Sequence, residues 1–173
     1  MATMEDIARK VGVSKGTVSK AINGAPDISE TLRKTIVEAA VELGYTRARR
    51  GAVRELGIFI ENMGYATPED FGTDIVTGFR QMAEPAGYDV RVIPLSDALE
   101  KSIRYDEYML QEGLLGALFL GLSLSDRWMH DFHTSHTPAV LYDNIVQPNP
   151  TVATLGMDNN EVIGQAVAAL RAM

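Results

Sequence analysis

Two lysines and several hydroxyl side chains crowd one short segment near the N-terminus. Lys15, Thr17, Ser19 and Lys20 recur at a spacing that sets them on the outer side of one helix. Ammonium and hydroxyl groups are the donors that proteins use against phosphate oxygens and the edge of guanine. The segment therefore predicts a helix that binds a nucleic acid.

Three short helices are expected to hold that segment in place. They span residues 4–11, 15–22 and 30–43, with Gly12 ending the first and Ser14 and Ser29 capping the other two. Ala8 is small where two helices cross, and Val18 is an apolar plug. This pattern is typical of a helix-turn-helix, whose second helix enters the major groove. The alternative is a plain helical hairpin with a solvated polar face.

The charge of the chain is divided unevenly. The whole chain of 173 residues has a net charge of −7. Residues 1–54 hold ten Lys/Arg against six Asp/Glu, a net of +4, whereas residues 55–173 hold six against seventeen, a net of −11. A basic head on an acidic body indicates a small polyanion-binding unit attached to a second domain.

From residue 56 onward, apolar strands alternate with helices. Strands are expected at 56–60, 88–93, 117–120, 138–142 and 152–157. A helix is expected at 71–84, and a second runs to residue 111 from a cap at Asp97, with Glu100 at the reciprocal capping-box position. A third is capped by Ser125 and runs to about 132, and the last runs from 159 or 160 to 173. Alternation of this kind predicts a parallel sheet covered on both faces. The fold class is therefore α + α/β, divided into a helix-turn-helix domain (1–46), a basic linker (47–55) and an α/β lobe (56–173). The last helix has no glycine stop and no following strand, so the lobe is expected to be incomplete.

Residues 4–45 resemble the DNA-binding headpiece of the LacI-type (lac repressor) bacterial regulators. The resemblance rests on these residues: Asp6-Ile7-Ala8, Gly12-Val13-Ser14, Thr17-Val18-Ser19, Asn23-Gly24, Ser29, Thr31, Arg33 and Leu43-Gly44-Tyr45. The remainder is similar more weakly, at Leu56-Gly57-Ile58, Gly78, Gly87-Tyr88 and 138–143. The resemblance implies a periplasmic-binding-protein-like sensor domain, of which only the N-terminal lobe is present.

The resemblance also implies a set of DNA contacts. Lys15, Gly16 and Lys20 fall at base-reading positions, although Gly16 has no side chain and Lys20 stands where arginine is usual. The remaining implied contacts, to phosphates or near the DNA backbone, are Thr3, Met4, Ser14, Thr17, Ser19, Asn23 and Ser29. The family's hinge helix inserts a leucine into the minor groove. This chain has arginines in that region instead, which either bind phosphates or form a solvated charge run.

A small-molecule site is expected at the carboxyl ends of the parallel strands. That edge would carry Asn62, Ser96, Ser123 and Asp143, with Tyr65 and Phe71 as an apolar wall. By resemblance, Asp143 binds the hydroxyl groups of an effector such as a sugar. The alternative for Asp143 is an ordinary turn aspartate. The ligand-binding candidates are therefore Asn62, Phe71 and Asp143.

Other chemistries find little support. There is no cysteine, and His130, His133 and His136 lack the carboxylates that would complete a metal site. No dinucleotide fingerprint or catalytic triad is visible, so no enzyme, metal or cofactor is expected. Without a signal peptide or a bilayer-length apolar run, the cytoplasm is the default location and no membrane partner is expected.

The sequence thus predicts a transcription regulator, and more specifically a repressor. Its expected partners are double-stranded operator DNA, a small-molecule effector and a second copy in a homodimer. The alternative is a ligand-binding module whose basic head is inactive.

Overall fold

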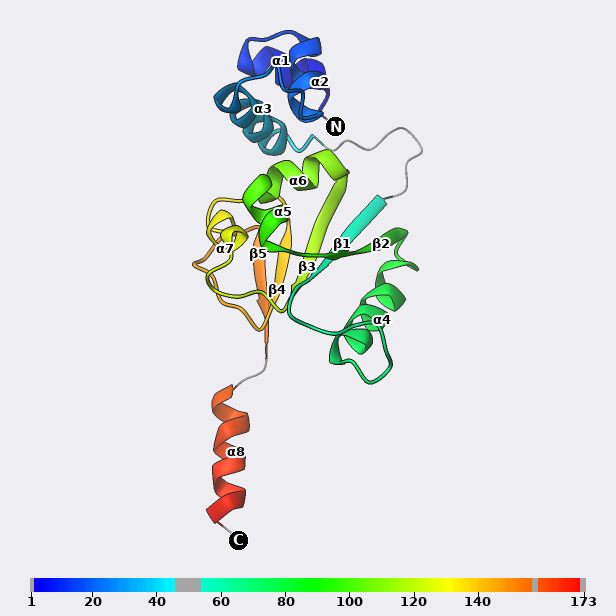
Figure 1. Cartoon of the computed structure of the whole chain (residues 1–173), viewed down its shortest axis with the longest axis vertical. Helices are drawn as coiled ribbons and strands as arrows, with labels where there is room; N and C mark the ends of the chain where they lie inside the picture. The colour runs from blue at the N-terminus through cyan, green and yellow to red at the C-terminus, as the bar shows by residue number, and fades with distance from the viewer. Residues whose placement is uncertain (1, 46–53, 157–158, 172–173) are drawn as a thin grey trace.

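The computed structural model describes residues 2–45, 54–156 and 159–171. Three helices form the N-terminal head: α1 (Met4–Val11), α2 (Lys15–Ile22) and α3 (Glu30–Glu42). Their bounds agree with those predicted from the sequence to within one residue. The head lies at one end of the molecule, with α6 of the body between it and the sheet (Figure 1).

Apolar residues at helical spacing hold the head together. Ile7, Val18, Ile22 and Ile36 have no exposed surface, and each comes from the inner side of its helix. Gly12 has a φ of 76°, a left-handed conformation that glycine adopts without strain and that ends α1. The turn at Gly12 therefore sets the crossing of α1 and α2.

The body is a five-stranded, all-parallel sheet. Its strands are β1 (Arg54–Ile60), β2 (Tyr88–Pro94), β3 (Leu114–Leu120), β4 (Ala139–Tyr142) and β5 (Val152–Leu155), in the order β2-β1-β3-β4-β5. The helices are α4 (Phe71–Ala83), α5 (Asp97–Ser102), α6 (Tyr105–Glu112), α7 (Arg127–Asp131) and α8 (Asn159–Arg171). The α + α/β fold class predicted from the sequence is confirmed.

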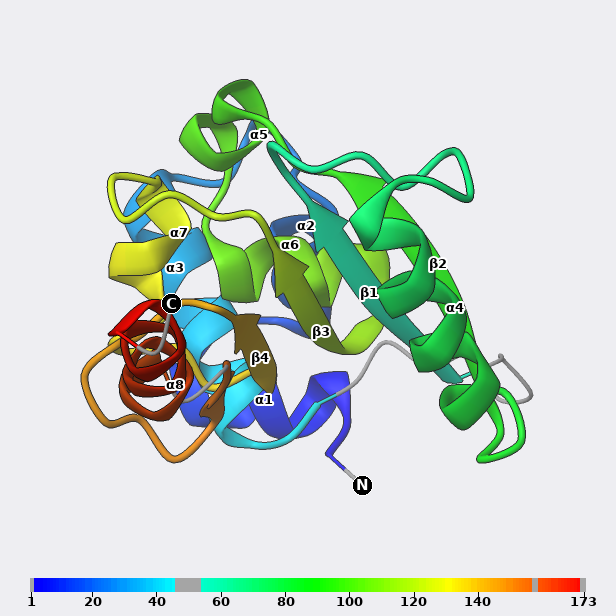
Figure 2. The same cartoon turned by 90° about the horizontal axis from the view of Figure 1, so that it is seen from below.

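Alternate residues of the central strands pack against opposite faces of the sheet. Phe59 and Phe119 face α5, α6 and α7, where their rings stack 4.9 Å apart. Ile58 and Leu118 face the other way and pack with Val76 of α4. Figure 2 shows α4 on one side of the sheet and α6 with α7 on the other. Burial on both faces explains why these strands read as continuous apolar runs.

The single helix predicted over residues 97–111 is wrong. Ile103 has extended φ and ψ angles of −151° and 149°, which separate α5 from α6. At this break the backbone carbonyl of Ile103 accepts a 2.9 Å hydrogen bond from the buried indole N–H of Trp128. The N-cap of α5 is Ser96 rather than Asp97, and that of α7 is Asp126 rather than Ser125. A tertiary contact has overridden a continuous helical pattern.

The last helix carries apolar side chains that are exposed to solvent. Ile163, Val167 and Leu170 of α8 are largely exposed, and α8 extends away from β5 in Figure 1. Among the residues that the structure describes, no helix has the length and apolar character needed to cross a bilayer.

Gly121, directly after β3, is expected to tolerate no other residue. Its φ of 76° is left-handed, and a Cβ there would overlap the backbone carbonyl of Glu61. We predict that Gly121→Ala lowers the free energy of unfolding by more than about 2 kcal/mol, since left-handed strain alone costs about 1–3 kcal/mol. Urea unfolding followed by the fluorescence of Trp128 measures this.

Gly78→Ala is the matched control. Gly78 lies within α4 with open space where its Cβ would stand. Alanine should therefore stabilise the lobe by about 0.5–1 kcal/mol. Equal effects of the two substitutions would contradict the geometry assigned to Gly121.

Candidate nucleic-acid interface

Ser14 fixes the start of α2. Its hydroxyl accepts a hydrogen bond from the backbone N–H of Thr17 at 3.1 Å and lies 2.9 Å from the Thr17 hydroxyl. An N-cap of this kind satisfies one of the free N–H groups of the first turn. The N-terminus of α2 is thereby held in a fixed orientation, with its partial positive charge facing outward.

The two faces of α2 differ sharply. Val18, Ala21 and Ile22 have no exposed surface and pack against α1 and α3. Lys15 and Lys20 are exposed on the opposite side. Gly16 lies between them, and a Cβ at Gly16 would meet only the Ser14 hydroxyl, at 3.6 Å. The absence of a side chain at Gly16 lets another surface approach the α2 backbone closely.

Both lysines of α2 are paired with carboxylates of the head. Lys15 Nζ lies 2.6 Å from Glu5, and Lys20 Nζ lies 2.5 Å from Asp27. The hydrogen bond from Lys20 holds the pKa of Asp27 below its usual value, and the bond to Glu5 raises the pKa of Lys15. Exposed ion pairs contribute only about 0–1 kcal/mol. Each lysine can therefore exchange its carboxylate for another acceptor at small cost.

Several of the other predicted contact residues also make hydrogen bonds within the head. The Thr3 hydroxyl donates to Asp6 at 2.7 Å, the Asn23 amide donates to the carbonyl of Ser19 at 2.7 Å, and Ser29 Oγ accepts from the N–H of Leu32 at 3.4 Å. Met4 is half-buried and packs onto the apolar core of the head. These residues shape the helix ends, and the Ser29 hydroxyl, which accepts its bond, retains its own proton to donate.

The basic linker is only partly visible, because residues 46–53 lie outside the described part of the chain. Arg54, expected to belong to the linker, is instead the first residue of β1. Its guanidinium donates to the Tyr88 hydroxyl and lies 4.2 Å from the centre of the Tyr88 ring. Arg54 therefore packs against the first residue of β2.

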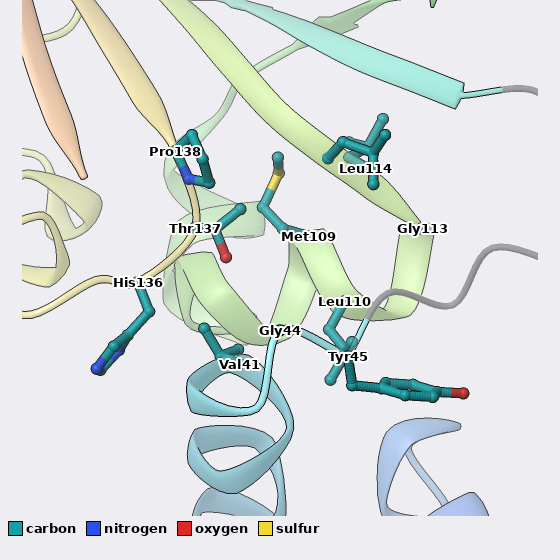
Figure 3. A pocket seen from close by; sticks show the side chains of 11 residues that line it. Val41, Gly44, Tyr45, Met109, Leu110, Gly113, Leu114, His136, Thr137 and Pro138 are labelled. Carbon is teal, nitrogen blue, oxygen red and sulfur yellow. The ribbon is translucent and has the colours of Figure 1, made fainter. Parts of the chain in front are cut away.

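The head contacts the lobe through α3 and α6. Arg33 Nε lies 3.8 Å from Glu107, and both side chains are mostly buried. Burial raises the pKa of Glu107 above its usual value, and the charge of Arg33 acts in the opposite sense. Leu110 of α6 packs into the apolar core of the head. A cavity of about 110 Å³ lies beside this contact, between Val41 and Tyr45 of the head and Met109 and Pro138 of the lobe (Figure 3).

The predicted ligand residues lie elsewhere, at the carboxyl edge of the sheet. Asn62 follows β1 and Asp143 follows β4, and both have a positive φ, 51° and 55°. Left-handed backbone in a non-glycine residue is uncommon and tends to cluster at functional sites. Phe71 is 62% exposed and its ring lies 6.2 Å from that of Tyr142. None of Asn62, Phe71 and Asp143 lines the cavity beneath the head.

The head of the chain matches a known protein family. Residues 3–48 match the family model described as bacterial regulatory proteins, lacI family. The head of the chain is therefore similar to the lacI family. The family's matched segment covers α1, α2 and α3, so it coincides with the head.

Similarity to curated proteins extends beyond the head into the body. Catabolite control protein A of Streptococcus mutans is 25% identical over 174 residues, covering 97% of this chain and 51% of the relative. The HTH-type transcriptional regulator YkvZ of Bacillus subtilis is 30% identical over 129 residues, covering 73% and 40%. A solved complex of transcriptional regulator CelR with cellobiose is 26% identical, covers 92% and 48%, and has a TM-score of 0.49. The chain spans about half the length of the curated relatives it matches.

The sequence shows Arg33 only as one of the residues that resemble the family, and its structural role was not predicted. Its guanidinium donates to the carbonyl of Ala21 at 3.1 Å and to that of Ala25 at 2.8 Å. It thereby holds the C-terminal end of α2 and the following turn. Within the described residues the three histidines form no group with other metal-ligand side chains, and His136 lies 3.7 Å from Asp106.

Arg33→Lys should loosen the end of α2. An ammonium cannot span two carbonyls as the planar guanidinium does. We therefore expect the free energy of unfolding of the head to fall by about 1 kcal/mol. Amide hydrogen exchange on the whole chain should then be several-fold faster in the last turn of α2. Arg9→Lys, at an exposed residue, is the control, and equal exchange in the two variants would contradict this role for Arg33.

Proposed function

We propose that this chain is the DNA-binding head and first lobe of a sequence-specific transcription regulator of the repressor type. The observation that carries the proposal is α2. Its inner face is fully buried, its N-terminus is capped by Ser14, and its outer face presents Lys15, Gly16 and Lys20 to solvent. A helix held in this way can enter the major groove as a rigid body. Several relatives named as transcriptional repressors, among them ExuR of Bacillus subtilis, support the proposal.

DNA binding on this proposal begins with an exchange of partners. Lys15 leaves Glu5 and Lys20 leaves Asp27, and each ammonium then donates to a base edge or a phosphate. Ser14, Thr17, Ser19, Asn23 and Ser29, with Thr3 and Met4, line the helix ends beside the DNA backbone. Hydroxyl, amide and N–H groups at helix ends suit phosphate oxygens.

The lobe on this proposal binds a small effector, such as a sugar, against its carboxyl edge. Asp143 accepts hydrogen bonds from effector hydroxyls, Asn62 offers an amide, and Phe71 offers an apolar face. The positive φ angles of Asn62 and Asp143 support the assignment, because they hold both residues in an uncommon conformation at the same edge. One short recognition helix reads few bases, so the working form is a homodimer on a near-palindromic site.

Lys20→Ala tests base reading. The substitution should weaken binding to a duplex that the protein selects from random DNA by about 1–3 kcal/mol, while binding to unrelated DNA changes less. Fluorescence anisotropy at fixed salt measures both affinities. Lys34→Ala, which removes an exposed lysine from α3, is the control. A parallel loss on both duplexes would assign Lys20 to a phosphate and overturn its base-reading role.

Asp27→Asn tests the exchange of partners. Removing the carboxylate leaves Lys20 unpaired before binding, so affinity for DNA should rise a few-fold and the salt dependence should steepen. Asp74→Asn removes the same charge from an exposed position on α4. If Asp74→Asn raises the affinity as much, the effect is one of net charge and the ion pair at α2 has no part in it.

A further inference from the structure

Three carboxylates from distant parts of the sequence meet beside the carboxyl ends of β1 and β3. Glu61 directly follows β1, Glu100 lies on α5, and Asp126 is the N-cap of α7. One carboxylate oxygen from each lies within 4.8 Å of one from each of the others. We propose that this cluster binds a divalent cation with oxygen ligands, Ca²⁺ foremost.

Backbone groups hold two of the three carboxylates in place. Glu100 Oε2 accepts hydrogen bonds from the N–H groups of Arg127 at 2.7 Å and Trp128 at 3.3 Å. Asp126 Oδ2 accepts one from the N–H of Ser123. Metal-binding carboxylates are commonly oriented by hydrogen bonds to their second oxygen. Both carboxylates here have that arrangement.

The oxygens left over are buried without partners. Glu100 is 2% exposed, and its Oε1 has no hydrogen-bond partner among the residues that the structure describes. The same is true of Glu61 Oε2 within that part of the chain. A buried carboxylate oxygen without a partner destabilises the folded state, because it has lost its hydrogen bonds to water and gained none in the protein. Two such oxygens in one cluster point to a ligand that both of them contact.

The charge at the cluster points to a cation. The charges that act most strongly on Glu61 are those of Asp126, Glu100 and Asp97, all negative. A divalent ion removes this repulsion where protonation of one carboxyl only reduces it.

The way the carboxylates are held favours Ca²⁺ over Mg²⁺. Calcium accepts irregular oxygen coordination at about 2.3–2.6 Å, whereas magnesium demands about 2.0–2.1 Å and a near-perfect octahedron. Glu100 and Asp126 are fixed by backbone N–H groups rather than by an octahedral ion, which suits the ion with the more flexible geometry. Water or backbone carbonyls would complete the coordination shell.

Terbium luminescence on the whole chain tests the proposal. Tb³⁺ replaces Ca²⁺ at oxygen sites and emits when a nearby indole is excited. The chain has one tryptophan, Trp128, whose backbone N–H already contacts Glu100. We expect sensitised emission that Ca²⁺ suppresses by competition, and a Tm that rises with Ca²⁺ because the ion binds only the folded state.

Glu61→Gln and Asp74→Asn form the matched pair of variants. Glu61→Gln removes one ligand and leaves the backbone hydrogen bonds to Glu100 and Asp126 intact, and should weaken Tb³⁺ binding by about tenfold or more. Asp74→Asn removes an exposed charge from α4, away from the cluster, and should leave the emission unchanged. Circular dichroism confirms that each variant is folded.

Three outcomes would overturn the proposal. These are no sensitised emission in the parent chain, emission that survives Glu61→Gln, and equal loss in both variants. In the first case Glu61 and Asp126 share a proton and the cluster holds no ion. DNA binding is not involved in these readouts, so they stand apart from the function proposed above.

Discussion

The buried indole of Trp128 sets the arrangement of the lobe. An indole N–H removed from water needs an acceptor, and the carbonyl of Ile103 supplies it at 2.9 Å. That carbonyl is free only because the chain leaves the helical conformation there. The ring itself packs edge-on against Phe59, 5.3 Å away, and against Tyr105, 5.6 Å away. One side chain thus connects the sheet, the break between α5 and α6, and the position of α7.

The same hydrogen bond explains why residues 97–111 form two helices rather than the one that their sequence predicts. Residues 97–111 carry a continuous helical pattern with Glu100 at a capping-box position, and local rules predict one helix. Glu100 instead accepts hydrogen bonds from Arg127 and Trp128, which lie more than 25 residues away in the chain. Local patterns carry no information on such partners. The three carboxylates of the proposed cation site were invisible for the same reason.

The head was predictable because its determinants are local. Ser14, Ser29 and Gly12 act within one helical turn of where they stand, and the structure places helix ends at each. What the sequence could not supply is the pairing of Lys15 with Glu5 and of Lys20 with Asp27, since each depends on how separate segments approach. The positive φ angles at Asn62 and Asp143 likewise depend on tertiary context, although the sequence does place both residues at strand ends.

Contact between head and lobe gives the two parts a direct physical connection. Arg33 bonds the end of α2 through Ala21 and Ala25, and its Nε faces Glu107 of α6. Arg104, just before α6, lies 3.8 Å from Glu38 of α3. A displacement of α6 therefore acts on the guanidinium that holds the end of α2. Because one side chain serves both contacts, any change in the lobe that moves α6 alters the free energy of holding α2 in place.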